Sequence, residues 1–188
     1  MALRPTASQT VGPFFIIGLT DNGRSELVAP SDPDAVRVGG VVLDGAGEPV
    51  DDALVEIWQA NRAGRYAHPE DAREELPLEE GFRGFGRCAT GPHGQYGFVT
   101  VKPGAVPAAG GAMQAPHIAM SVFARGLLKR VATRMYFPDE TEANEADPVL
   151  NSIEDAADRS TLVAKAADGT LRFDIHLQGD RQTVFFDV

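Results

Sequence analysis

Residues 114–126 read QAPHIAMSVFARG, a stretch whose alternation predicts a β-strand. Successive side chains of a strand point to opposite faces of the sheet. One face of this strand would therefore carry His117, Ala119, Ser121, Phe123 and Arg125. The other face would carry Ile118, Met120, Val122 and Ala124.

Six further short stretches carry strand signals, separated by turn clusters such as GPHG, KPG and QGD. They are VRVGGVVL (36–43), ALVEIWQA (53–60), QYGFVTV (95–101), TRMYF (133–137), LRFDIHL (171–177) and QTVFFDV (182–188). Repeated short strands with few helix-length patterns predict an all-β fold, an antiparallel β-sandwich. We expect a single domain over residues 1–188, with residues 1–13 forming an N-terminal arm.

Two acidic stretches interrupt the strand signals. Residues 69–81 predict an exposed loop excursion. Residues 138–165 have some helical character, because Val149, Leu150 and Ile153 recur at helical spacing after Pro148. Charge runs of this kind are usually solvated faces, so neither stretch identifies a partner.

Composition limits the function classes. The chain has 188 residues, a formal net charge of −10 and a single cysteine, Cys88. An acidic balance argues against a nucleic-acid or acidic-membrane surface, and an anionic small substrate would need a local cationic group. No internal disulfide is possible, and neither a signal peptide nor a membrane-spanning run is apparent. We expect a soluble protein of the reducing cytoplasm.

His117 raises a question of chemistry. A His-x-His pair on a strand would set two imidazoles about 6.6 Å apart on one face, which suits two ligands of one metal ion. The second place holds Ala119, which coordinates nothing. From the residues alone, His117 is either half of a lost ligand pair or an ordinary polar residue in a sheet. His68, His93 and His176 show no ligand pattern, and Cys88 reads as a structural thiol.

A resemblance bears on this choice. The stretches that carry it are SQTVGPFF (8–15), LDGAGEPVDDALVEIWQANRAGRY (43–66), FGRCATGPHGQYGFVTVKPG (85–104), APHIAMSVFARG (115–126), TRMYFPDE (133–140) and VFFDV (184–188). In this order they resemble the intradiol ring-cleaving dioxygenases. The similarity covers essentially the whole chain, so it implies that family's β-sandwich over residues 1–188.

The resemblance implies a cofactor and a reaction. Catalytic chains of the family hold a non-haem Fe(III) with two Tyr and two His, and the iron binds both oxygens of a catecholate. The activated ring is attacked by O₂ and cleaved between its two hydroxyl-bearing carbons. Within the family, this chain is similar to iron-free α chains that pair with an iron-bearing β chain. That implies cleavage of protocatechuate to 3-carboxy-cis,cis-muconate, in the β-ketoadipate pathway of aromatic catabolism.

When the four iron ligands of the family are matched to this sequence position by position, two of the four ligand side chains are present. Tyr66 in GRY and His117 in APHIA match ligand positions, whereas Val106 and Ala119 stand where the second Tyr and the second His would be. Two groups do not hold Fe(III) against water and competing chelators. The resemblance therefore implies that Tyr66 and His117 are relics, and that Fe(III) is bound by the β chain.

The resemblance also implies substrate-binding residues at the junction with the β chain. The matching positions are Thr10, Gly12 and Pro13 in SQTVGP, and Arg125 in FARG. A Gly-Pro turn allows close approach to a flat ring, and Arg125 would supply the cation for a substrate carboxylate. The plainer interpretations are an N-terminal turn and a surface or salt-bridged arginine.

Two other functions stay open. One is a metal-free β-sandwich that serves as a scaffold or ligand-binding module without catalysis of its own. The other is a self-sufficient dioxygenase whose iron has unconventional ligands, such as Tyr66 and His117 together with Tyr136 or His68. The missing Tyr and His weigh against the second.

Overall fold

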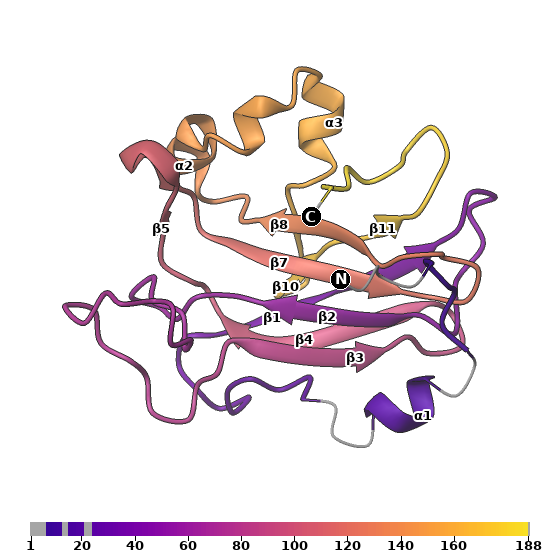
Figure 1. Ribbon diagram of the computed structural model, residues 1–188, viewed down its shortest axis with the longest axis horizontal. Coiled ribbons are helices and arrows are strands. Elements are labelled where there is room, and N and C mark those ends of the chain that lie inside the picture. Colours follow the sequence, from indigo (N-terminus) through magenta and orange to yellow (C-terminus); the bar gives the residue numbers. More distant parts are fainter. Residues whose placement is uncertain (1–6, 13–14, 21–23, 188) are drawn as a thin grey trace, which may run out of the picture.

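A computed structural model describes residues 7–12, 15–20 and 24–187 (Figure 1). Pro13 lies outside the described residues. The strands are β1 Ala35–Leu43, β2 Leu54–Trp58, β3 Phe85–Ala89, β4 Gln95–Val101, β5 Val106–Pro107, β6 Met113–Gln114, β7 His117–Phe123, β8 Val131–Tyr136, β9 Lys165–Ala167, β10 Thr170–Arg172 and β11 Ile175–His176. The helices are α1 Phe15–Thr20, α2 Thr141–Ala146 and α3 Ala156–Ser160, with 3₁₀ turns η1 Ala109–Gly111 and η2 Leu150–Ser152.

Two sheets face each other across one main core. The first is built on β1, which pairs with β4 along its length and with β10 and β11, and β9 extends it beyond β10. The second has the order β3-β2-β7-β8, with antiparallel pairing throughout. Between them lie buried apolar side chains from both sheets, among them Val38, Val42, Phe98, Val55, Ile57, Ile118, Met120, Val122 and Met135. The predicted all-β sandwich is confirmed.

Every second side chain of residues 118–124 is buried, as the alternation of a strand requires. Ile118, Met120, Val122 and Ala124 are each at most 2% exposed and lie in the main core. The opposite face of β7 is turned away from this core, and its members from Ala119 to Phe123 are only half-buried. β7 therefore presents its His117 face on the outer side of the second sheet.

The predicted strand LRFDIHL is divided in two. Phe173 and Asp174 lie between β10 and β11, where the chain crosses β1 closely. A Cβ on Gly40 would come within 2.0 Å of the Phe173 carbonyl oxygen, so only glycine fits there. The Asp174 carboxylate accepts a hydrogen bond from the Val41 N–H at 3.0 Å. Both pieces pair with β1 in parallel, a departure from the antiparallel arrangement of the other pairs.

Other expectations at the chain ends and in the loops need correction. QTVFFDV does not form a strand among its described residues, where only Phe186 makes a bridge, to Ala132. β3, which carries the free thiol of Cys88, was not anticipated as a strand. Residues 69–81 form turns, and most of them are exposed as predicted.

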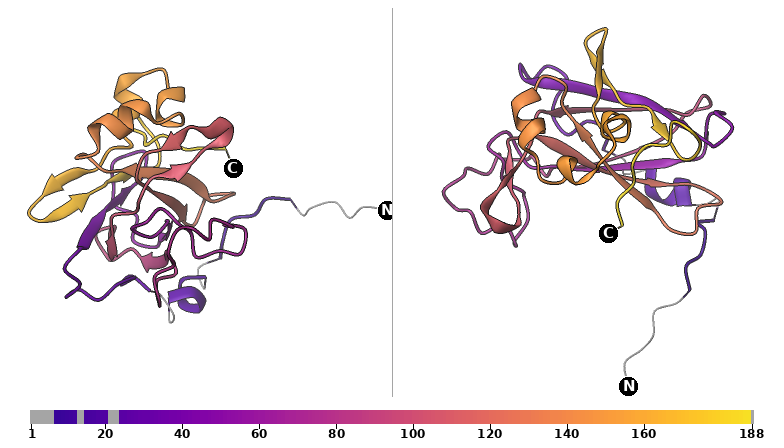
Figure 2. Two further views of the ribbon diagram at one scale, coloured as in Figure 1. Left: turned by 90° about the vertical axis from the view of Figure 1, so that its left-hand side faces the viewer. Right: turned by 90° about the horizontal axis from the view of Figure 1, so that it is seen from above.

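The helical segment predicted within 138–165 is present as three short pieces, α2, η2 and α3 (Figure 2). They group at one edge of the sandwich beside β8 (Figure 1). A second, smaller core joins them to the sheet, with Leu150 and Leu162 packed around the buried Tyr136. No helix within the described residues is long and apolar enough to cross a membrane.

Candidate functional site

The loop that carries Tyr66 is fixed by its own sequence. Gly64 has φ +80°, a conformation that favours glycine, and the Asn61 side chain accepts hydrogen bonds from the N–H groups of Ala63 and Arg65 at 3.0 and 2.9 Å. The Tyr66 N–H donates to the Asp71 carboxylate at 2.8 Å. Tyr66 is therefore held at the end of a rigid turn that follows β2.

Two glycines join this loop to the segment before β5. A Cβ on Gly64 would lie 2.2 Å from the Ala105 carbonyl oxygen, and a Cβ on Gly104 would lie 2.6 Å from the Gly64 nitrogen. The Gly104 N–H also donates to the Asn61 carbonyl at 2.9 Å. This contact places Val106, buried at 4% exposure, in the same cleft as Tyr66.

His117 lines the cleft in a neutral form. Its side chain is 5% exposed, and its Nδ1–H donates to the Ala115 carbonyl at 2.7 Å. Burial, aided by the nearby charge of Arg134, lowers the pKa of His117 to about 4. The ring lies 5.7 Å from that of Tyr136. With Nδ1 protonated, Nε2 is left as an acceptor.

The depressed pKa of His117 predicts a pH-dependent stability. The unfolded chain binds a proton near pH 6.5 and the folded chain only near pH 4, so stability falls as pH falls through this window. Between about pH 6.5 and about pH 5 the loss should be about 1.5 kcal/mol. Urea unfolding of His117→Gln across this range should show a correspondingly flatter dependence on pH. His93→Gln, at an exposed position, is the control, and an unchanged slope in His117→Gln would contradict the assignment.

Arg134 lies on the outer face of β8. Its Nη1 donates to the Gln114 side-chain oxygen at 2.6 Å, and the Gln114 amide in turn donates to the Pro107 carbonyl at 3.0 Å. Its guanidinium also lies 5.8 Å from the centre of the Phe186 ring. Strand register places Ala119 directly between Trp58 and Arg134.

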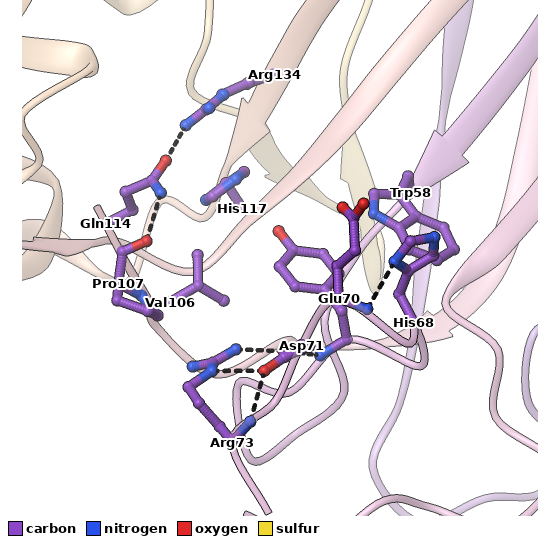
Figure 3. Close-up of a pocket in the computed structure, with 11 residues that line it drawn as sticks. Trp58, His68, Glu70, Asp71, Arg73, Val106, Pro107, Gln114, His117 and Arg134 are labelled. Carbon is purple, nitrogen blue, oxygen red and sulfur yellow. Dashed lines mark hydrogen bonds and ion pairs between the residues drawn. The ribbon is translucent and has the colours of Figure 1, made fainter. Parts of the chain in front are cut away.

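These side chains line one cleft of about 670 Å³ at one end of the second sheet (Figure 3). Val106 and Pro107 lie on one side of it, Trp58 and His68 on the other, with His117 and Arg134 between and above them (Figure 3). The remaining lining residues are Tyr66, Glu70, Asp71, Arg73 and Gln114. The structure thus brings together Tyr66, His117 and Val106, which the sequence placed in one lost site.

Thr10 and Arg125 lie elsewhere. The Thr10 hydroxyl accepts a hydrogen bond from the Gly126 N–H at 2.8 Å, which ties the N-terminal arm to the turn after β7. Arg125 is ion-paired with Asp52, although its side chain is 60% exposed, and it lines a second cleft that contains none of the residues around His117. Gly12 is exposed near the end of the arm. Thr10 thus lies beside Gly126, the residue after Arg125, at the other end of β7 from His117.

A family model described as Dioxygenase matches residues 11–179. An α chain of protocatechuate 3,4-dioxygenase from Pseudomonas putida is 43% identical, over 98% of this chain and 97% of that protein. The chain belongs to the intradiol dioxygenase family. A β chain of protocatechuate 3,4-dioxygenase from Burkholderia cepacia is 39% identical to this family member, over 78% of this chain and 65% of that protein.

A solved structure agrees with the fold of this intradiol dioxygenase chain. The dioxygenase domain of a dioxygenase–carbohydrate-binding fusion from Streptomyces sp. SirexAA-E is 27% identical with a TM-score of 0.58. The match covers 94% of this chain and 99% of that one. It is similar over the whole sandwich, so the fold assignment does not depend on a local motif.

The intradiol dioxygenase family is iron-dependent, and the cleft is where iron ligands would be expected in this chain. Its donor set does not fit Fe(III). Tyr66 and His117 are present, but Val106 is apolar and Ala119 lacks a donor. Arg134 places a positive charge beside Ala119, where a cation would be repelled.

Unconventional ligands do not complete the set either. His68 lines the cleft, but its Nδ1 accepts a hydrogen bond from the Glu70 N–H at 3.3 Å and its ring meets Trp58 edge-on. Tyr136 is buried and directs its hydroxyl to Asp147 at 3.2 Å. No three His, Cys, Asp or Glu side chains in the described part of the chain gather as a metal site would require.

The sequence did not indicate most of the other residues that line the cleft, including Arg134 and Gln114. TRMYF was recognised as a strand, but alternation does not reveal which residue of a neighbouring strand lies opposite Ala119.

Proposed function

We propose that this chain is the α-type subunit of a two-chain intradiol dioxygenase that cleaves protocatechuate with O₂ to 3-carboxy-cis,cis-muconate, in aromatic catabolism. The observation that supports this proposal most strongly is the sequence match to two α chains, which covers nearly the full length of this chain and of each relative. A β chain of the same enzyme also matches, which fits two related subunits. Catalysis then requires the partner, and the single cysteine suits a cytoplasmic location.

The proposal assigns Fe(III) to the β-type partner. It is supported by the cleft of this chain, which offers Tyr66 and His117 but no further donors at Val106 and Ala119. When bound by the partner, the iron would supply the activation of the catecholate ring. This chain would instead contribute binding and orientation of the substrate.

The substrate would contact the turn after β7, where Arg125 is followed by Gly126, the partner of Thr10. Arg125 is exposed enough to leave Asp52 and hold a carboxylate, since an exposed ion pair contributes only about 0–1 kcal/mol. The Thr10 hydrogen bond to Gly126 fixes the N-terminal arm beside it. Gly12 and Pro13, the latter outside the described residues, complete the proposed substrate-binding set.

Iron content tests the proposal. The chain produced alone should be colourless and contain no stoichiometric iron, because two donors do not retain Fe(III). Co-production with a β-type chain should give a coloured complex, since tyrosinate-to-Fe(III) charge transfer absorbs visible light. Metal analysis and absorption spectra of both preparations provide the measurement.

Two results would contradict the proposed α-subunit function. One tightly bound iron per isolated chain, with a visible band, would favour a self-sufficient dioxygenase. A chain that forms no complex with any β-type partner would favour a metal-free scaffold or binding module.

A further inference from the structure

Arg134 is a half-buried cation without a carboxylate partner among the described residues. The ion pairs of this part of the chain involve Arg62, Arg73, Arg87, Lys102, Arg125, Lys129 and Arg172. The contacts of Arg134 are instead uncharged: an amide oxygen on Gln114, the hydroxyl of Tyr136 and the ring of Phe186. Gln114 is itself anchored to Pro107, so the guanidinium is held in place without being neutralised.

The other charged groups nearby are mostly engaged. Arg73 is paired with Asp71 through two hydrogen bonds, at 2.8 and 2.5 Å. The buried Asp147 carboxylate accepts from the N–H groups of Ala115, Val149 and Leu150 and from the Tyr136 hydroxyl. Glu70 remains, an exposed carboxylate on the cleft lining. The charge of Arg134 also lowers the pKa of His117, which stays neutral.

The walls of the cleft suit a flat apolar ring. Trp58 and Tyr66 lie nearly parallel, with ring centres 5.7 Å apart and planes 10° from one another. Val106 and Pro107 form the facing side (Figure 3). Strand register places Ala119 between Trp58 and Arg134, so the aromatic wall and the guanidinium lie about 9.5 Å apart across the sheet, two strand spacings.

We propose that this cleft is a metal-free binding site for a small aromatic carboxylate. The carboxylate pairs with the Arg134 guanidinium, whose planar fork matches it, and the ring lies between the Trp58–Tyr66 wall and Val106. The His117 Nε2 is available to accept a hydrogen bond from a ring substituent. This site belongs to the chain itself and does not depend on the proposed dioxygenase reaction or on Arg125.

Trp58 makes the site observable, because it is the only tryptophan of the chain. The full chain is titrated with 4-fluorobenzoate, followed by ¹⁹F line broadening and by Trp58 fluorescence. 4-Fluorobenzamide tests the same ring without the charge, and inorganic phosphate tests the charge without the ring. If the chain can be purified only with its partner, the number of 4-fluorobenzoate sites is measured in the wild-type complex and in the Arg134→Gln complex. The difference between the two numbers gives the sites that depend on Arg134.

Removing a positive and a negative charge from the cleft should change the affinity for 4-fluorobenzoate in opposite directions. Arg134→Gln should weaken 4-fluorobenzoate binding about tenfold to a hundredfold, as expected for a lost hydrogen bond to a charged group. Glu70→Gln should tighten it several-fold, because an opposing charge at the exposed lining is removed. Arg37→Gln, at an exposed position on β1 in the other sheet, removes the same charge as a control and should change nothing.

The expected result is saturable binding of the benzoate that perturbs Trp58, with benzamide and phosphate much weaker. Equal binding of benzamide and benzoate would overturn the role of Arg134, and preference for phosphate would indicate a simple anion site. If Arg134→Gln does not fold, the wild-type comparison of benzoate with benzamide and the Glu70→Gln titration still decide. No saturable binding to the wild-type chain would refute the site.

Discussion

Replacing Arg125 with alanine should raise the KM of the α/β complex for protocatechuate about tenfold to a hundredfold. The proposed contact is a guanidinium–carboxylate hydrogen bond in a chain of net charge −10, and such bonds to charged groups contribute roughly 1.5–3 kcal/mol. The conversion to KM holds where KM follows affinity. Steady-state kinetics of the purified complex measure it, with iron content checked in parallel.

Two controls separate binding from assembly. Catechol lacks the carboxylate, so its poor turnover should hardly change in Arg125→Ala. Asp52→Asn frees Arg125 from its ion-pair partner and should leave the KM for protocatechuate unchanged or lower it. Equal losses for both substrates would assign Arg125 to assembly, and unchanged protocatechuate kinetics would remove it from the substrate site.

Replacing Asp147 with alanine should lower the free energy of unfolding by about 3–5 kcal/mol. Its carboxylate is 0% exposed and accepts three backbone hydrogen bonds of 2.7–2.8 Å, from Ala115, Val149 and Leu150. Alanine would leave three donors without partners in an apolar environment. Urea unfolding of the purified protein, followed by circular dichroism, gives the difference.

A helix cap elsewhere provides the matched comparison. Asp155 accepts one hydrogen bond from the Ala157 N–H at 2.6 Å at the exposed start of α3, and Asp155→Ala should cost only about 1 kcal/mol. Asp147→Asn keeps the shape and one acceptor oxygen, so it should fall between the two. A loss in Asp147→Ala no larger than in Asp155→Ala would show that water replaces the carboxylate.

Local patterns predicted β1, β2, β4, β7 and β8, but not β3, and they placed a strand at residues 182–188 where the described residues form none. Alternation in residues 118–124 placed Ile118, Met120 and Val122 on one face of a strand, and the structure buries that face because a sandwich covers one side of each sheet. Alternation could not reveal that Arg125 and His117 line different clefts, since β7 ends at Phe123. A shared face over a short stretch does not imply a shared cavity.

The cleft itself depends on contacts between distant segments. The meeting of Gly64 with Gly104 and the register of Ala119 with Arg134 decide which side chains surround His117. Neither is encoded in the period of a single strand. The division of LRFDIHL has the same origin, because the close approach of Phe173 to Gly40 is a tertiary contact that overrides strand propensity.

The pairing of β1 with β10 and β11 also has a consequence for biosynthesis. Val41 and Asp174 are hydrogen-bonded although 133 residues separate them, and the register of β1 with β10 is equally long-range. During translation one edge of β1 must stay unpaired until residues 170–176 have emerged from the ribosome, although the other can pair earlier with β4. Such non-local closure is slow. Nascent chains arrested before residue 170 therefore present an open strand edge, on which chaperones and neighbouring nascent chains compete.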